Sequence, residues 1–133
     1  MAGAASIGDF GSGPRMVVPL SAGLATSSDR MSFQRRDTPV LSPGAPGAWD
    51  ANIIVLPRLI PIHGGWRLYY NSGGCIGYAE SGNGVVWGKR GIVLRPYPDP
   101  DRFDSRGVAT RAFLSIPGGL VMMYAAAGPD SER

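Results

Sequence analysis

The sequence predicts an all-β fold, and three observations lead to that expectation. Glycine and proline, with 20 and 12 copies in 133 residues, occur at roughly twice their average frequency, which favours turns over long helices. Short β-branched and aromatic runs alternate with turn residues along the chain. Hydrophobic residues make up 44% of the sequence, which is enough for a buried core and argues against a disordered chain.

An internal repeat decides the kind of β fold. Without any gap, one constant shift superimposes identical or similar residues along most of the chain, among them Gly23 on Gly77, Ser27 on Ser81, Trp49-Asp50 on Phe103-Asp104, Gly65 on Gly119 and Tyr70 on Tyr124. The period is too long for a leucine-rich or ankyrin repeat and fits a four-stranded β-propeller blade. The expected fold is therefore a partial β-propeller with a 54-residue repeat.

One complete blade occupies the middle of the chain. We expect its four strands at residues 53–60, 66–71, 76–80 and 85–89. Glycines in the 61–65 turn supply the positive φ that a tight reversal needs. Asn83-Gly84 predicts a two-residue hairpin between the third and fourth strands.

Half a blade is expected on each side. The last two strands of a preceding blade fall at 24–26 and 31–35, and the first two strands of a following blade at 108–115 and 120–125.

The domain organisation follows from the repeat. Residues 1–22 form a flexible lead-in, residues 23–127 contain the repeats with the second copy starting near 77, and residues 128–133 form a tail. A closed propeller needs at least four blades, and half-blades leave bare strand edges. The chain is therefore expected either to be part of a longer protein or to self-associate through its open blade edges.

Composition excludes several classes of site. Cys75 is the one cysteine and His63 the one histidine in the sequence, which excludes a disulfide framework, a cysteine-based zinc site and a two-histidine metal centre. We expect no metal and no cofactor.

Charge and hydrophobicity limit the partners. The net charge is +3, and the 12 arginines and one lysine form no run longer than two, so no nucleic-acid-binding patch is expected. The longest apolar run, 120–127, is shorter than a membrane helix requires, and no secretory signal is visible at the start. Neither nucleic acid nor membrane is an expected partner, and the cellular location stays open.

Two hairpin motifs resemble a known group of proteins. The run from Ile76 to Ser81, followed by Asn83-Gly84 and Trp87, resembles the IGxAxSxDGxxW hairpin of the five-bladed propellers in glycoside hydrolase families 32, 43, 68 and 130, which include arabinanases, levansucrases and invertases. Residues 23–29 with Phe33 are its other copy, and 66–70 and 120–124 resemble the second strand of that group. The resemblance covers about residues 23–127 and implies a glycan substrate and acidic catalytic residues on inner strands.

The catalytic candidates are Asp50 and Asp104. Where that group carries an inner-strand acid, this chain has Leu56 and Thr110, so the two repeat-related aspartates just upstream are the substitutes. A pair of carboxyls can act as acid and base on a glycoside. The alternative is that each carboxylate caps backbone N–H groups in a loop between blades. We expect the isolated chain to be inactive.

The candidate ligand-binding residues are two aromatics and two arginines. Trp49 and Phe103 could stack on sugar rings or pack between blades. Arg58 and Arg111 could bind glycan carboxylates or hydroxyls, or pair with the two aspartates.

Other repeating aromatics belong to the expected core, namely Phe33, Tyr70, Trp87 and Tyr124. The sequence thus points to a protein similar to glycoside hydrolases, a fragment or degenerate copy, that cleaves or binds glycans. The alternative is a non-catalytic propeller module that binds a glycan or a protein.

Overall fold

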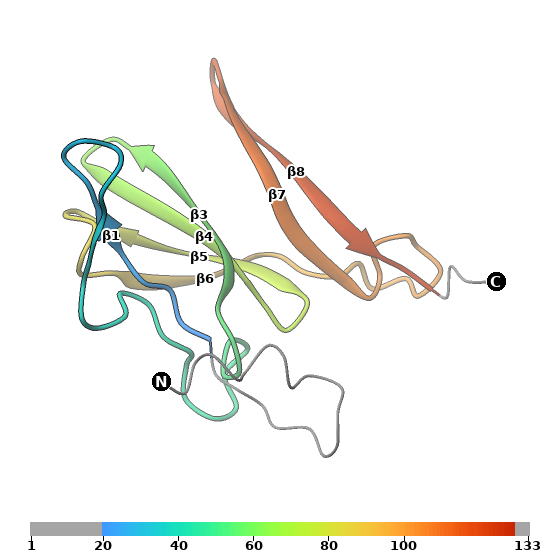
Figure 1. Cartoon of the computed structure of the whole chain (residues 1–133). Helices are drawn as coiled ribbons and strands as arrows, with labels where there is room; N and C mark the ends of the chain where they lie inside the picture. The colour runs from blue at the N-terminus through green and yellow to red at the C-terminus, as the bar shows by residue number, and fades with distance from the viewer. Residues whose placement is uncertain (1–19, 130–133) are drawn as a thin grey trace.

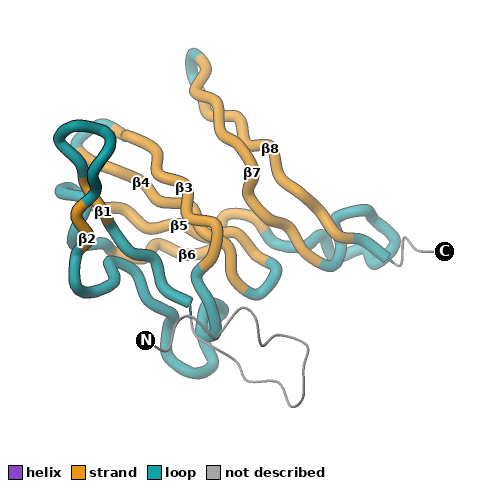
Figure 2. The backbone as a smooth tube through the Cα atoms, in the orientation of Figure 1, coloured by secondary structure: helices purple, strands orange, loops and turns teal. Residues whose placement is uncertain are grey.

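A computed structural model describes residues 20–129, which form an all-β structure with no helix (Figure 1). Its strands are, in chain order, β1 (Ala25–Thr26), β2 (Gln34–Arg35), β3 (Val55–Ile62), β4 (Gly65–Ser72), β5 (Cys75–Ser81), β6 (Gly88–Leu94), β7 (Gly107–Ile116) and β8 (Gly119–Ala127). They form one four-stranded sheet, β3-β4-β5-β6, and two two-stranded sheets, β1-β2 and β7-β8. Long loops connect the three sheets (Figure 2).

The four-stranded sheet confirms the first three expected strands of the central unit and the presence of a fourth. All three strand pairs are antiparallel, and each pair joins neighbours in the sequence. The β3–β4 reversal is tight because Gly64 adopts a φ of 83°, a conformation that costs glycine little. Ile62 pairs with Gly65 directly across it, so β3 runs two residues further than the sequence indicated.

The expected start of the fourth strand is wrong, and the two-residue hairpin with it. β5 ends at Ser81 and β6 begins at Gly88, so Trp87 lies in the connecting loop and not in a strand. Two polar side chains hold this loop. The Ser81 hydroxyl accepts bonds from the N–H groups of residues 83 and 84, and the Asn83 amide oxygen accepts from residues 85 and 86. Backbone groups that would extend the ladder are therefore used locally.

The same hydrogen bonds recur one repeat earlier in the chain. Ser27 and Asp29 accept bonds from the N–H groups of residues 29 to 32 in the same pattern. The long loops repeat as well, since bonds from Ala48 N to Ala45 O and from Ala51 N to Ala48 O match those from Arg102 N to Asp99 O and from Ser105 N to Arg102 O. Repeated sequence thus gives repeated local structure.

Two hydrophobic clusters lie on opposite faces of the four-stranded sheet. The first contains Leu68 and Tyr70 of β4 and joins the sheet to residues 20–54 through Ala22, Leu41 and Ile54. The second contains Tyr69 and Tyr78 and joins the sheet to the β7–β8 hairpin, where Phe113, Met122 and Tyr124 pack against it. Neighbouring residues of β4 therefore point into different clusters, as strand alternation requires.

The two terminal segments of the expected domain organisation lie partly outside the described residues. Residues 1–19 of the expected lead-in and 130–133 of the expected tail lie there. Leu20 and Ala22 already take part in bridges with Ile53 and Leu41.

Phe33, expected in the core, is instead 62% exposed.

Candidate functional site

Asp50, the first catalytic candidate, is buried, and its carboxylate is bound by a tyrosine and a lysine. It lies in the loop before β3 and is 3% exposed. The Tyr70 hydroxyl donates a hydrogen bond to its Oδ2 at 3.0 Å, and the Lys89 ammonium lies 2.8 Å from the same oxygen. Burial, followed by the bond to the carboxylate, raises the pKa of Tyr70, because ionising the phenol would place a second negative charge beside the first. Asp50 therefore ties its loop to β4 and β6.

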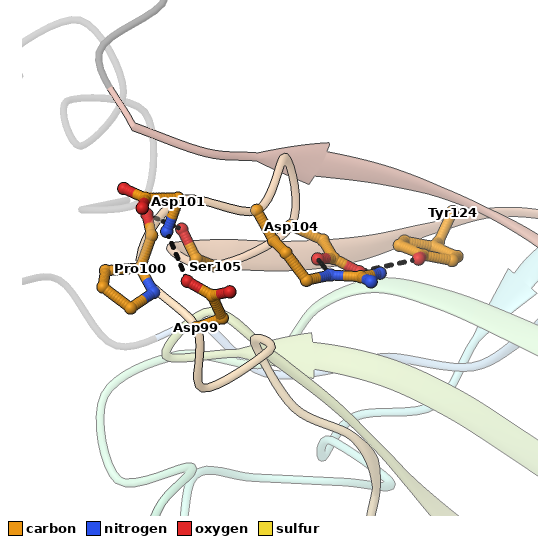
Figure 3. Close-up of polar contacts among 7 residues, drawn as sticks. Asp99, Pro100, Asp101, Asp104, Ser105 and Tyr124 are labelled. Carbon is orange, nitrogen blue, oxygen red and sulfur yellow. Dashed lines mark hydrogen bonds and ion pairs between the residues drawn. The ribbon is translucent and has the colours of Figure 1, made fainter.

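Asp104 repeats this arrangement with a different cation (Figure 3). It is 6% exposed, accepts a 3.0 Å bond from the Tyr124 hydroxyl and lies 3.1 Å from Nε of Arg102. Arg102, followed by Tyr124, lowers the pKa of Asp104, since both partners favour the charged carboxylate. Other polar contacts in Figure 3, from Asp101 N to Asp99 and from Ser105 to Pro100 O, stiffen the same loop.

The geometry of both aspartates favours a structural role over catalysis, but through side-chain partners and not through the loop N–H groups that the sequence suggested. A glycosidase needs one carboxyl held protonated and another held ionised across the sugar. Here the two carboxylates have equivalent tyrosine partners and a cation each. These contacts surround both carboxyls with the same kinds of group, so they do not distinguish an acid from a base. They hold the two loops in place.

The two aromatic candidates differ in environment. Trp49 stacks on Tyr70 with ring centroids 5.4 Å apart and packs against the first hydrophobic cluster. Its indole also lies against Gly77, where any Cβ would overlap the ring. Phe103 is 63% exposed and lies 6.5 Å from the Tyr124 ring. Of these two residues, Phe103 is therefore the one whose ring is open to a ligand.

The expected pairing of Arg58 and Arg111 with the two aspartates is wrong. Lys89 and Arg102 take those positions instead, and the two arginines form no ion pair with any residue in 20–129. Nε of Arg58 is shielded from solvent without a hydrogen-bond partner there. One Arg111 guanidinium N–H donates to the Thr110 carbonyl at 3.2 Å. Both side chains keep donor capacity that their surroundings do not use.

Both arginines sit at β-bulges in equivalent strands. The β3–β4 register shifts between Val55 and Arg58, and the β7–β8 register shifts between Thr110 and Ala112. Leu56, within the first bulge, has a φ of 53°, which is costly for a leucine. Bulges re-aim side chains and recur beside binding sites. Sequence reasoning missed this feature because a bulge leaves no residue-type signature here.

A buried polar pair joins β4 to the bulged strand β7. Thr110 is fully buried, and its N–H donates to the Asn71 amide oxygen at 2.9 Å, while the Asn71 amide donates back to the Thr110 hydroxyl at 3.1 Å. The Thr110 hydroxyl also lies 3.5 Å from the carbonyl of Leu56, its counterpart in the preceding repeat. The position at which the resemblance would place an acid is thus a structural contact between repeats.

A cavity of about 450 Å³ lies on the other side of the four-stranded sheet, next to β1. Its lining is mainly apolar and includes Leu24, Val40, Leu59, Trp66, Leu68 and Trp87.

Three further features of residues 20–129 bear on possible sites. His, Cys, Asp and Glu side chains form no group of three that could hold a metal ion there. No helix in that part of the chain has the length and apolar character to cross a membrane. Glu80 pairs with Arg67 at 2.7 Å, and this contact followed by Arg90 lowers the pKa of its carboxyl.

Comparisons with protein families, curated proteins and solved structures found no match to this chain.

Proposed function

We propose that the chain is a propeller-type blade repeat that binds a carbohydrate without cleaving it. The observation that carries this proposal is the state of Asp50 and Asp104, which are buried and each held by a tyrosine and a cation. A lowered pKa at Asp104 is the opposite of what a general acid for glycoside cleavage requires.

Support for the blade repeat comes from strand order and repeated contacts. A meander of four antiparallel strands is the unit from which propellers are built. The C-terminal hairpin β7–β8 corresponds to β3–β4, and β1–β2 corresponds to parts of β5 and β6, all at a shift of one repeat. The hairpin packs on a face of the four-stranded sheet, as a following blade would.

The carbohydrate ligand is supported by the resemblance of the hairpin motifs and by the two arginines. Arg58 and Arg111 occupy the bulged strands that correspond to innermost strands of a propeller, and neither has an acidic partner in residues 20–129. A guanidinium recognises a carboxylate through two parallel hydrogen bonds. The ligand class that fits is therefore a glycan bearing carboxylates, such as a uronic-acid polymer.

Affinity electrophoresis tests this proposal with polygalacturonate and neutral arabinan in the gel. We expect polygalacturonate to retard the full chain more strongly than arabinan does. Arg58→Gln and Arg111→Gln should each weaken retardation roughly tenfold, as the loss of a hydrogen bond to a charged group predicts. Arg95→Gln is the matched control, because Arg95 is exposed and lies outside both bulges. Equal retardation of all three variants contradicts the proposed site.

Hydrolysis is tested on the same preparation. Arabinan, xylan, fructan and polygalacturonate incubated with the chain should release no reducing sugar. If sugar is released and Asp50→Asn or Asp104→Asn abolishes the release, the pair is catalytic and the binding proposal is wrong.

A further inference from the structure

Two apolar features of the described residues lack a partner and lie at opposite ends of the repeat. One is the 450 Å³ cavity beside β1. The other is the outer face of the β7–β8 hairpin, where Leu114 and Met123 are 63% and 68% exposed and Ile116 and Val121 are also exposed. Exposed apolar patches of this kind mark interaction surfaces.

The repeat indicates what belongs in the cavity. Five members of the second hydrophobic cluster have counterparts one repeat earlier in the first, namely Ile76 with Ala22, Leu94 with Val40, Val108 with Ile54, Met122 with Leu68, and Tyr124 with Tyr70. Two more, Tyr78 and Phe113, correspond to Leu24 and Leu59, which line the cavity. The first cluster is therefore an incomplete version of the second.

The missing part can be named. The second cluster also contains Ile60 of β3 and Tyr69 of β4, which face the following hairpin. Within residues 20–129 nothing supplies their counterparts to the first cluster. The cavity occupies the place where a β3–β4 type hairpin would insert one aliphatic and one larger apolar side chain.

The C-terminal hairpin carries these side chains. Leu114 and Met123 are the repeat counterparts of Ile60 and Tyr69. Both are apolar, both are exposed, and both lie on the face of the hairpin turned away from Phe113 and Met122.

Backbone edges match as well. Among the described residues β8 pairs with β7 alone, and β1 pairs with β2 alone. In the complete sheet the equivalent strands, β4 and β5, pair with each other, and Arg67 opposite Glu80 forms a 2.7 Å salt bridge. Their counterparts, Val121 and Thr26, are both uncharged, so that pairing β8 with β1 leaves no unpaired charge at this position.

We propose that β8 of one copy pairs antiparallel with β1 of a second copy, and that Leu114 and Met123 fill the second copy's cavity. This inference rests on the proposed blade repeat. The β4–β5 register of Tyr69 with Tyr78 and Leu68 with Ala79 places Met123 opposite Leu24 and Met122 opposite Ala25. The contact is head-to-tail, which closes into a ring when the rotation between copies allows it.

The strand count limits such rings. Residues 20–129 of each copy supply eight strands, the content of two four-stranded blades, so a ring built from these residues has an even number of blades. Propellers of four to eight blades correspond to about two to four copies.

Paired cysteines test the register in the full chain. In a Cys75→Ser background, Met123→Cys with Leu24→Cys should form disulfides between chains and give oligomers on a non-reducing gel, because the equivalent Tyr69 and Tyr78 are directly opposite each other in the β4–β5 register and directly opposed residues are close enough for a disulfide. Met123→Cys with Ala25→Cys is the control, since a one-residue slip turns the side chain to the other face of the strand. A disulfide within a single chain, equal cross-linking of both pairs, or none in either overturns the proposed pairing.

Sedimentation velocity tests the assembly without introduced cysteines. The unaltered chain should sediment as an oligomer whose mass is an integral multiple of the chain mass. The Met123→Lys variant should sediment as a monomer, because a lysine on an edge strand blocks strand pairing. Met31→Lys is the matched control, since Met31 is 82% exposed and does not line the cavity. If the unaltered chain is a monomer, the inference is wrong. That result is expected if β1 is covered by residues 1–19 of the same chain and not by a second copy.

The same samples separate this inference from the proposed function. Monomer that still binds polygalacturonate overturns the interface alone. Oligomer that does not bind it overturns the carbohydrate ligand alone.

Discussion

Tyr70→Phe is the substitution that best tests whether Asp50 is structural. It removes only the hydroxyl from a fully buried ring, and that hydroxyl donates to Asp50 at 3.0 Å. A hydrogen bond to a charged group contributes about 1.5–3 kcal/mol. Asp50 keeps its contact with Lys89 at 2.8 Å, so the loss should lie in the middle of that range, about 2 kcal/mol.

Urea unfolding followed by far-UV circular dichroism measures this loss. We expect a lower midpoint with an unchanged m-value, and a melting temperature lower by roughly 8 °C. Protein concentration is kept equal across variants, because association would add to the apparent stability. Tyr78→Phe is the control, since no hydrogen bond from its hydroxyl occurs among residues 20–129.

A cycle with Asp50→Asn completes the test. The two substitutions should be strongly non-additive if the hydroxyl and the carboxylate form one unit. If Tyr70→Phe loses no more stability than Tyr78→Phe, the buried bond does not hold the loop, and a structural role for Asp50 is contradicted.

Three further substitutions test the repeat and its contacts. Gly77→Ala should cost about 1–3 kcal/mol by forcing a Cβ into the Trp49 indole, whereas Gly23→Ala, its repeat counterpart with nothing within 4 Å, should unfold at the unaltered urea midpoint. Thr110→Val should cost about 1–3 kcal/mol by leaving a buried amide partly unpaired, and hydrogen exchange should show faster opening of β7; unchanged exchange would contradict a role in joining the repeats. Backbone N–H groups of residues 32 and 31, followed by the Ser27 hydroxyl, lower the pKa of Asp29 from 3.8 to about 2, so its contribution to stability is present above pH 3.8 and lost as the pH falls through about 2. A carboxyl NMR titration with its midpoint near the ordinary value would refute this, and Asp29→Asn, which copies the second repeat, should keep the loop and remove that acid-dependent part.

Local sequence was sufficient for the β3–β4 and β7–β8 hairpins, but not for the start of β6. Glycines at 64 and 65 and the apolar runs on either side determine the β3–β4 reversal, because positive φ and strand alternation are properties of a few consecutive residues. The repeat period identified which residues are equivalent, and the repeated tyrosine–aspartate bonds have that spacing.

Contacts between distant segments needed the tertiary structure. The cation that pairs with Asp50 is Lys89 of β6 and not Arg58 or Arg111. The sequence could not show this, since the pairing depends on how a loop folds across the sheet. The bulges that shift Arg58 and Arg111 follow from the register between strands, which a single strand does not encode. Phe33 has the residue type and repeat position of a core aromatic yet is exposed, because burial depends on the surface packed against a residue as well as on its hydrophobicity.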